Sequence, residues 1–258
     1  MKPRLILFPL LCGILLAAGW GLLAPKSSLR ITDAVAVPIA EMPHAVRVWF
    51  RLANDGPPAQ ITGVAAGRYQ ASLYAPDATR SLPLPAGAEA IFAEDGAHVV
   101  VTLDEPARDG LILPVDLTLA TGKTHSFRAR VVAISPDGQA GEVGLFGFGE
   151  ICRAGPGEPA PGLSISARAD GDGWIVDVLT RDFQFTRDFL NGPHIAGTGH
   201  GHLYVGGVKL ARLFAPSYRI PALPKGDHII RVTLNTNDHR AYVVDDIPVT
   251  AIAKISVR

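Results

Sequence analysis

The sequence predicts an all-β protein in which two β-sandwich domains, of cupredoxin-like or immunoglobulin-like type, follow an N-terminal signal or anchor segment. The composition, with Gly 27, Pro 21 and 7% aromatic residues, is typical of a chain with many turns. Short runs in which apolar and polar residues alternate recur throughout, and no stretch keeps a helical period. The 258 residues are 48% hydrophobic, which is enough for two cores.

The chain begins with a segment typical of export. Lys2 and Arg4 precede a continuous apolar run over residues 5–16, and Ala17 and Gly19 offer small residues to a signal peptidase. Residues 5–24 are also long enough to cross a bilayer as an uncleaved anchor. Residues 1–25 are therefore predicted to be a signal peptide or a membrane anchor. Both alternatives place the remainder in the periplasm or elsewhere outside the cytoplasm, with membrane contact through this segment alone.

Charge and cysteine content restrict the function further. A formal net charge of zero lacks the electrostatic signature of nucleic-acid binding. Removal of the leader leaves Cys152 as the sole cysteine, so an intramolecular disulfide cannot form. Cys152 can be a Cu(I) ligand, a dimerisation site or a buried small hydrophobe, and we expect the last of these.

The first domain is predicted over residues 26–134. Turn signals such as NDGP at 54–57 and EDG at 94–96 separate short strands, in the proportion expected of a β-sandwich. The expected strands are 29–37, 45–53, 59–65, 70–74, 90–92, 98–103, 115–119 and 124–132.

Five segments of this domain carry a resemblance to a known family: VRVWFRLANDG (46–56), SLPLPAGAEA (81–90), DGAHV (95–99), 111–119 and 124–132. In the order and spacing of these segments the domain resembles the PCu(A)C family of periplasmic copper chaperones. The resemblance implies that the second histidine of the family's Cu(I) site falls on His98 and its methionine companion on Val100. The first histidine and methionine fall on or near Tyr74 and Pro76. Valine and proline cannot replace soft thioether ligands, so we expect a retained fold and a lost chaperone site.

A connector is predicted at residues 135–162, because AGPGEPAPG at 154–162 opposes regular structure. The second domain, residues 163–258, is predicted as a β-sandwich and as the candidate metal-binding domain. Its expected strands are 163–169, 174–180, 202–205, 208–214, 228–235, 241–244 and 249–257.

Four histidines of this domain stand out. His194, His200 and His202 lie in a glycine-rich stretch, and His239 ends the turn-like run NTNDH. Residues two apart in a strand share a face, so His200 and His202 can reach one ion, with each nitrogen about 2.0–2.1 Å from it. The sequence therefore predicts a metal site formed by these four residues. The alternative is that they are ordinary solvated loop residues.

Three further residues are candidates for supporting roles at this site. Asp238 can orient the imidazole of His239 or hydrogen-bond the backbone of its own turn. Tyr204 shares the predicted face of His202, and His98 is the family histidine named above. This half is similar to secreted bacterial modules that carry H-x(5)-H-x-H-L-Y followed by N-x-N-D-H, a pattern to which we attach no activity.

Ligand chemistry suggests the ion. Imidazole favours Cu(II) or Zn(II) over Cu(I), so copper as Cu(II) is expected and zinc is the alternative. An unperturbed imidazole pKa of about 6.5 predicts that affinity falls below about pH 6.

We therefore expect an exported copper-binding or copper-delivery protein, whose partners are the ion and an acceptor protein in the periplasm or membrane. The alternative is a non-metal interaction module that docks on such a protein. The sequence shows no nucleophile–base pair, phosphate loop or HExxH motif, so we expect no enzyme. A copper redox activity using Tyr204 and Tyr242 is the minor alternative.

Overall fold

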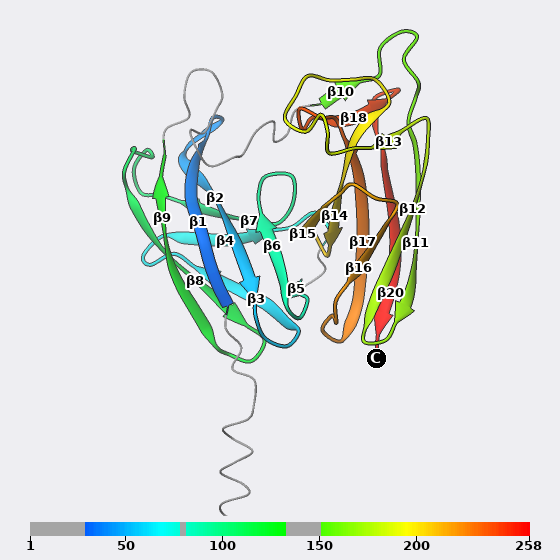
Figure 1. The fold of residues 1–258 in the computed structure, drawn as a ribbon. Coiled ribbons are helices and arrows are strands. Elements are labelled where there is room, and N and C mark those ends of the chain that lie inside the picture. Colours follow the sequence, from blue (N-terminus) through cyan, green and yellow to red (C-terminus); the bar gives the residue numbers. More distant parts are fainter. Residues whose placement is uncertain (1–28, 78–80, 133–150) are drawn as a thin grey trace, which may run out of the picture.

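The computed structural model describes residues 29–77, 81–132 and 151–258. Within them the chain consists of strands and turns without a helix, which confirms the predicted all-β class. The strands form two groups (Figure 1), which we call the N-terminal half, residues 29–132, and the C-terminal half, residues 151–258. The predicted export segment and most of the predicted connector lie outside the described residues. The described residues include no helix long and apolar enough to cross a membrane.

The N-terminal half is built around β2, which pairs with β1 on one side and with β6 and β7 on the other. β1 pairs in parallel with β9, and β8 and β3 continue the sheet to β5. The buried rings of Phe50 and Phe92 stack at 4.3 Å between centroids in its core. The strands are β1 (Leu29–Ile39), β2 (Met42–Asn54), β3 (Ala59–Ala65), β4 (Gln70–Tyr74), β5 (Leu82–Leu84), β6 (Ala88–Phe92), β7 (His98–Thr102), β8 (Ile112–Leu119) and β9 (Thr124–Val131).

The C-terminal half has one sheet in the order β15-β14-β17-β20 and another in the order β11-β12-β16. Leu203 and Val205 of β14 lie in the same buried cluster as Val176 and Val178 of β12, so the two sheets share a core. The strands are β10 (Ile151–Arg153), β11 (Gly162–Asp170), β12 (Gly173–Arg181), β13 (Gln184–Phe185), β14 (Thr198–Val205), β15 (Val208–Leu213), β16 (Ser217–Ile220), β17 (Gly226–Asn235), β18 (Ala241–Val244), β19 (Ile247–Pro248) and β20 (Thr250–Val257).

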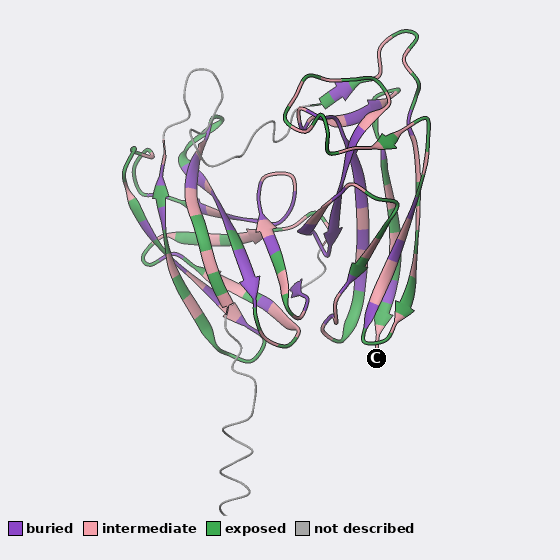
Figure 2. Cartoon of the chain, in the orientation of Figure 1, coloured by how far each residue is buried: buried purple, intermediate pink, exposed green. Residues whose placement is uncertain are grey.

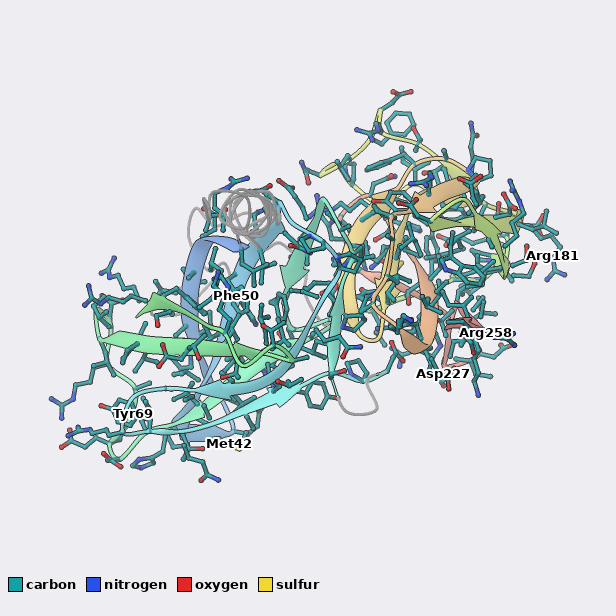
Figure 3. The ribbon with its side chains drawn as sticks, turned by 90° about the horizontal axis from the view of Figure 1, so that it is seen from below. Met42, Phe50, Tyr69, Arg181, Asp227 and Arg258 are labelled. Atoms are coloured by element: carbon teal, nitrogen blue, oxygen red, sulfur yellow. The ribbon has the colours of Figure 1, made fainter. Side chains whose placement is uncertain are left out.

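The two halves are joined by strand pairing. β6 pairs antiparallel with β15 at Ile91 and Lys209, and the two strands face each other at the centre of Figure 1. The turn after β6 also docks on the β14–β15 hairpin, where the Ala97 amide donates to the Gly207 carbonyl at 2.7 Å. Seen from below in Figure 3, side chains of both halves meet between Tyr69 at one outer side and Arg181 at the other. The halves therefore share an interface that sequence periodicity did not predict.

Strand β14 is buried along almost its whole length (Figure 2). The sequence placed its start at residue 202, but the strand begins at Thr198, so two of the glycines expected to turn the chain lie inside it. Five other strands, β5, β10, β13, β16 and β19, were not predicted. β10 falls within the predicted connector and pairs in parallel with β18, which buries Cys152. Burial raises the pKa of the Cys152 thiol, in keeping with the expected role as a small hydrophobe.

Candidate metal centre

Three of the four predicted histidines come together. His200 and His202 project from the same face of β14, and His239 comes from the turn between β17 and β18. Their relative exposures are 0%, 3% and 6%, and one ring nitrogen from each lies within 4.8 Å of the others. Among the described residues, this is the one group of three His, Cys, Asp or Glu side chains close enough to hold an ion. The period-two argument from sequence therefore placed His200 and His202 correctly relative to each other.

Glycines let β14 approach its neighbours closely enough to bring the imidazoles together. A Cβ at Gly199 would lie 2.0 Å from the carbonyl oxygen of Asn235, the residue that pairs with His200 on β17. A Cβ at Gly201 would lie 3.2 Å from Cβ of Leu213 on β15. The pattern G-H-G-H thus places a histidine on the polar face and a glycine on the crowded face in alternation.

A network of turn hydrogen bonds holds His239 in place. Its φ of 71° lies in the left-handed region, which is uncommon for residues other than glycine. The His239 amide donates to the Thr236 carbonyl at 3.1 Å, and the Asn235 side-chain amide donates to the His239 carbonyl at 3.2 Å. The Asn237 side chain ties this turn to Thr198 at the start of β14, with a distance of 3.0 Å. The run NTNDH therefore builds the turn that presents one histidine.

The hydrogen bonds assign a tautomer to each imidazole. His202 Nδ1 lies 3.0 Å from the Asp95 carboxylate and donates to it, which leaves a lone pair on Nε2. His200 Nε2 then donates to His202 Nε2 at 3.0 Å, and His200 Nδ1 is buried without a hydrogen-bond partner. His239 Nε2 donates to Oδ1 of Asn191 at 2.6 Å, so its Nδ1 is free to bind. Each ring thus has a nitrogen that can serve as a ligand, provided that His200 either moves its proton to Nδ1, which frees Nε2, or binds through Nδ1.

The spacing of the rings fits a bound ion. Two nitrogens bound to one metal at about 2.05 Å are about 3.3 Å apart in tetrahedral geometry and about 2.9 Å apart at a right angle. The observed separation of 3.0 Å between Nε2 of His200 and Nε2 of His202 lies between these values. The pair therefore suits either tetrahedral Zn(II) or tetragonal Cu(II) after a shift of a few tenths of an ångström.

All three imidazoles are neutral at neutral pH. Burial is the main cause that lowers the pKa of His200 to about 2, of His202 to about 3 and of His239 to about 4. Positive charge nearby acts in the same direction, from Lys209 on His202 and from Arg212 on His239. Neutral imidazole is the form that binds a metal. The sequence predicted that metal affinity falls below about pH 6. Burial shifts this fall to more acidic pH, because the free rings are protonated only near their lowered pKa values.

Asp95 lies beside these rings as an ionised carboxylate. Its Oδ2 accepts hydrogen bonds from Lys209 Nζ at 2.7 Å and from the Tyr204 hydroxyl at 2.8 Å, in addition to the bond from His202. Burial alone would raise the pKa of Asp95, but Lys209 and His202 outweigh it and hold that pKa well below its ordinary value. Burial lowers the pKa of Lys209 to about 8, with Asp95 opposing the shift, so the pair is ionised at neutral pH.

The other candidate residues occupy different positions. His194 contacts Glu158, with Nε2 3.3 Å from Oε2, and the Tyr242 hydroxyl at 3.5 Å, and it is not part of the group of three. Asp238 accepts hydrogen bonds from Arg240 at 2.8 Å and from Thr236, so it serves its own turn. No hydrogen bond joins Asp238 to the His239 ring among the contacts of the described residues.

Tyr204 and His98 also have defined surroundings. Tyr204 shares the face of His202, and its hydroxyl lies 3.3 Å from Nδ1 of that ring. His98 is buried, its Nδ1 lies 3.0 Å from the Gly96 carbonyl, and its ring lies 4.8 Å from that of Tyr74 across the β4–β7 pair. The positions that the resemblance assigned to the chaperone site thus hold an imidazole packed on a phenol.

Sequence reasoning missed two residues that touch the histidines. Asp95 lies 107 positions before His202, in a run that was noted only as a turn signal. Asn191 opens the glycine-rich stretch, and the sequence analysis assigned it no role. Its φ of 65° lies in the left-handed region, which asparagine tolerates better than most residues. The sequence around a polar turn residue does not indicate which distant strand the turn packs against.

Comparisons with known proteins find similarity to solved structures. No family model matches the chain, and no curated protein matches it. Among solved structures, the copper-bound PCuAC domain from PmoF2 matches with 15% identity over 42% of this chain and 96% of that chain, with a TM-score of 0.37. The apo PCuAC domain from PmoF1 matches with 17% identity over 42% of this chain and 97% of that chain, with a TM-score of 0.37. The Pseudomonas aeruginosa CupB2 chaperone matches with 10% identity over 88% of this chain and 100% of that chain, with a TM-score of 0.26.

The resemblance to PCu(A)C proteins is thus supported in part, because PCuAC domains are among the similar solved structures.

Proposed function

We propose that this chain is an exported metal-binding protein that holds one Cu(II) or Zn(II) ion through His200, His202 and His239. The observation that carries the proposal is the convergence of three buried imidazoles, with one nitrogen of each within 4.8 Å of the others. Side chains from two separate segments meet there, which would tie ion binding to the fold of this end of the C-terminal half.

Two features of the metal-free protein are unfavourable for a cluster that serves packing alone. The buried Nδ1 of His200 has no hydrogen-bond partner, which costs about 1–3 kcal/mol relative to a satisfied group. The left-handed backbone at His239 is a strained conformation of the kind that gathers at functional sites. A cluster selected for packing alone would gain more from apolar side chains of similar volume. A bound ion would give each ring a ligand bond at one of its nitrogens and would use the backbone geometry of the His239 turn.

The ligand chemistry favours copper as Cu(II), with zinc as the alternative. The cluster offers imidazole nitrogen and no thiolate or thioether, which disfavours Cu(I). His194 remains a candidate fourth ligand or lid, and reaching the ion would require it to leave Glu158. We further propose that the protein receives or delivers copper outside the cytoplasm, on the evidence of residues 1–25 in the sequence.

Metal titration of the full mature chain tests the proposal. Wild-type protein should bind one Cu(II) or Zn(II) per chain at pH 7.5, with a nitrogen-rich coordination spectrum for the Cu(II) form. The double variant His200→Ala/His202→Ala should retain its β circular dichroism and lose this binding. Equal stoichiometry and affinity in the two proteins would show that the histidines are ordinary polar residues. The interaction-module alternative would then replace the metal site.

A further inference from the structure

We propose that Asp95 is the positioning residue of this centre, so that a carboxylate from the N-terminal half prepares a ligand of the C-terminal half. The inference rests on the proposed function and adds to it the requirement that both halves be docked. His202 cannot present Nε2 to an ion unless its proton is held on Nδ1, and Asp95 holds it there at 3.0 Å.

Three hydrogen-bond donors hold the Oδ2 atom of Asp95 in position. Oδ2 accepts from three donors, namely His202 Nδ1, the Tyr204 hydroxyl at 2.8 Å and Lys209 Nζ at 2.7 Å. Lys209 and Tyr204 are 1% and 2% exposed, so water does not compete for these bonds. The donors come from β14 and β15, whereas Asp95 comes from the turn between β6 and β7. The carboxylate is therefore held by the C-terminal half although it belongs to the N-terminal half.

The turn that carries Asp95 is docked by its backbone. The Ala97 amide donates to the Gly207 carbonyl at 2.7 Å, and the Ala93 amide donates to the Ala97 carbonyl at 3.0 Å. A Cβ at Gly96 would lie 2.8 Å from the Gly207 carbonyl oxygen, so the approach is close enough to exclude other residues. The β6–β15 pairing at Ile91 and Lys209 fixes the register of this contact. The position of Asp95 thus depends on the junction, and the metal site depends on it in turn.

Removal of this bond has a defined consequence. Without a charged acceptor at Nδ1, the neutral ring can place its proton on Nε2, which points at Nε2 of His200 where the ion would bind. Carboxylates that orient ligand histidines contribute about 10–100-fold to metal affinity. By linkage, an ion that binds the docked arrangement better must also stabilise the docking.

The test uses the full mature chain and Zn(II) in competition with a chelator of known affinity at pH 7.5. Asp95→Asn should bind one ion with an affinity lowered by about 10–100-fold. The matched control is Asp77→Asn, because Asp77 also pairs across the junction, with Arg231 at 2.7 Å and 12% side-chain exposure. Arg231 reaches the site through the face of the Tyr204 ring, 3.9 Å from its guanidinium carbon. That control should bind within about threefold of wild type. A control that loses as much affinity as Asp95→Asn would overturn the positioning role in favour of a general effect of docking.

A second control separates orientation from charge. Asp95→Asn leaves Lys209 without the carboxylate that favours its charged form, and Lys209→Met removes the ammonium group altogether. The double variant Asp95→Asn/Lys209→Met should remain as weak as Asp95→Asn if the bond to His202 is what matters. Recovery of wild-type affinity in the double variant would overturn the proposal.

The tautomer of His202 can be read directly and does not depend on metal binding. In a long-range ¹H–¹⁵N correlation spectrum of the metal-free wild-type chain at pH 7.5, His202 should show the Nδ1–H tautomer. A His202 ring protonated on Nε2 in that spectrum contradicts the proposal whatever the variants do. A wild-type chain with this tautomer that binds no Zn(II) instead removes the proposed function and leaves the Asp95–His202 bond as a structural feature.

Discussion

The Asp95 carboxylate lies 3.0 Å from Nδ1 of His202, although 107 positions separate the two residues and they belong to different halves of the chain. The contact places the candidate metal centre at the junction of the halves, on the polar face of β14. The opposite face of β14, with Leu203 and Val205, packs into the core. One strand therefore serves the hydrophobic core and the candidate site by alternation.

His194 should contribute less to metal affinity than the three clustered histidines. Its ring contacts Glu158 and Tyr242 in the structure, so binding an ion would require these contacts to break. We expect His194→Gln to lower Zn(II) affinity by less than about fivefold, whereas His239→Gln should lower it by about 100-fold or more. Removal of a residue that binds the ion lowers affinity more than removal of a residue that only lies near it. Isothermal titration at pH 7.5 compares them. Equal losses in the two variants would show that His194 becomes a fourth ligand when the ion binds.

The N-terminal half should not bind Cu(I) tightly. Tyr74 and His98 face each other on β4 and β7, with rings 4.8 Å apart, and no thioether stands at the positions that Pro76 and Val100 occupy. The test uses a full chain in which the three clustered histidines are changed to glutamine. We expect this chain to bind Cu(I) more weakly than a Cu(I) chelator does in a competition assay. His98→Gln in that background is the control and should not weaken the residual binding. Tight one-to-one binding that His98→Gln abolishes would restore a chaperone site to this half.

Acid should destabilise the metal-free chain. Burial lowers the pKa of His200, His202 and His239 to about 2, 3 and 4, whereas the unfolded chain titrates near about 6.5. Between those values the unfolded state binds more protons than the folded state, so stability is present above about pH 6.5 and is lost as the pH falls. Each ring can contribute up to about 1.4 kcal/mol per pH unit.

Chemical denaturation of the metal-free protein at pH 7.5, 6.0 and 5.0 measures this effect. We expect the unfolding free energy to fall steadily over the series, and to fall less steeply in a chain with all three histidines changed to glutamine. Parallel profiles for the two proteins would mean that the imidazoles are protonated without cost in the folded state.

Gly199 should tolerate no side chain. A Cβ there would lie 2.0 Å from the Asn235 carbonyl oxygen, and backbone atoms cannot move aside as a flexible side chain can. We expect Gly199→Ala to lower the unfolding free energy by roughly 2–4 kcal/mol, since it strains the pairing of β14 with β17. Gly63→Ala is the matched control, because its Cβ would lie 3.7 Å from Cβ of Thr118, an ordinary contact. Similar denaturation midpoints for both variants would argue against the close packing of these two strands.

The sequence predicted what depends on local patterns. Alternation gave the all-β class and the common face of His200 and His202, because the side-chain period of a strand is a local property. It misjudged the start of β14, since Gly199 and Gly201 allow close strand packing and not a turn at this place. It missed β16, whose residues Ser217–Ile220 are flanked by prolines that read as turn signals.

Long-range contacts were beyond the same reasoning. Asp238 was considered as a partner of His239 because the two are adjacent in sequence, yet its carboxylate pairs with Arg240 and the ring bonds Asn191. The carboxylate that does orient a histidine is Asp95, and its contact depends on the β6–β15 pairing. The register of one strand against another from a different half has no signature in either segment alone.

X-ray absorption at the Zn edge of the zinc-loaded full chain tests the metal site most directly. The structure predicts about three imidazole nitrogens at about 2.0–2.1 Å, with the outer-shell scattering of histidine rings. His239→Gln should lower the imidazole count by one while leaving the other distances unchanged. An ion coordinated mainly by oxygen, or a spectrum that His239→Gln and His202→Ala both leave unaltered, would contradict a metal centre at His200, His202 and His239.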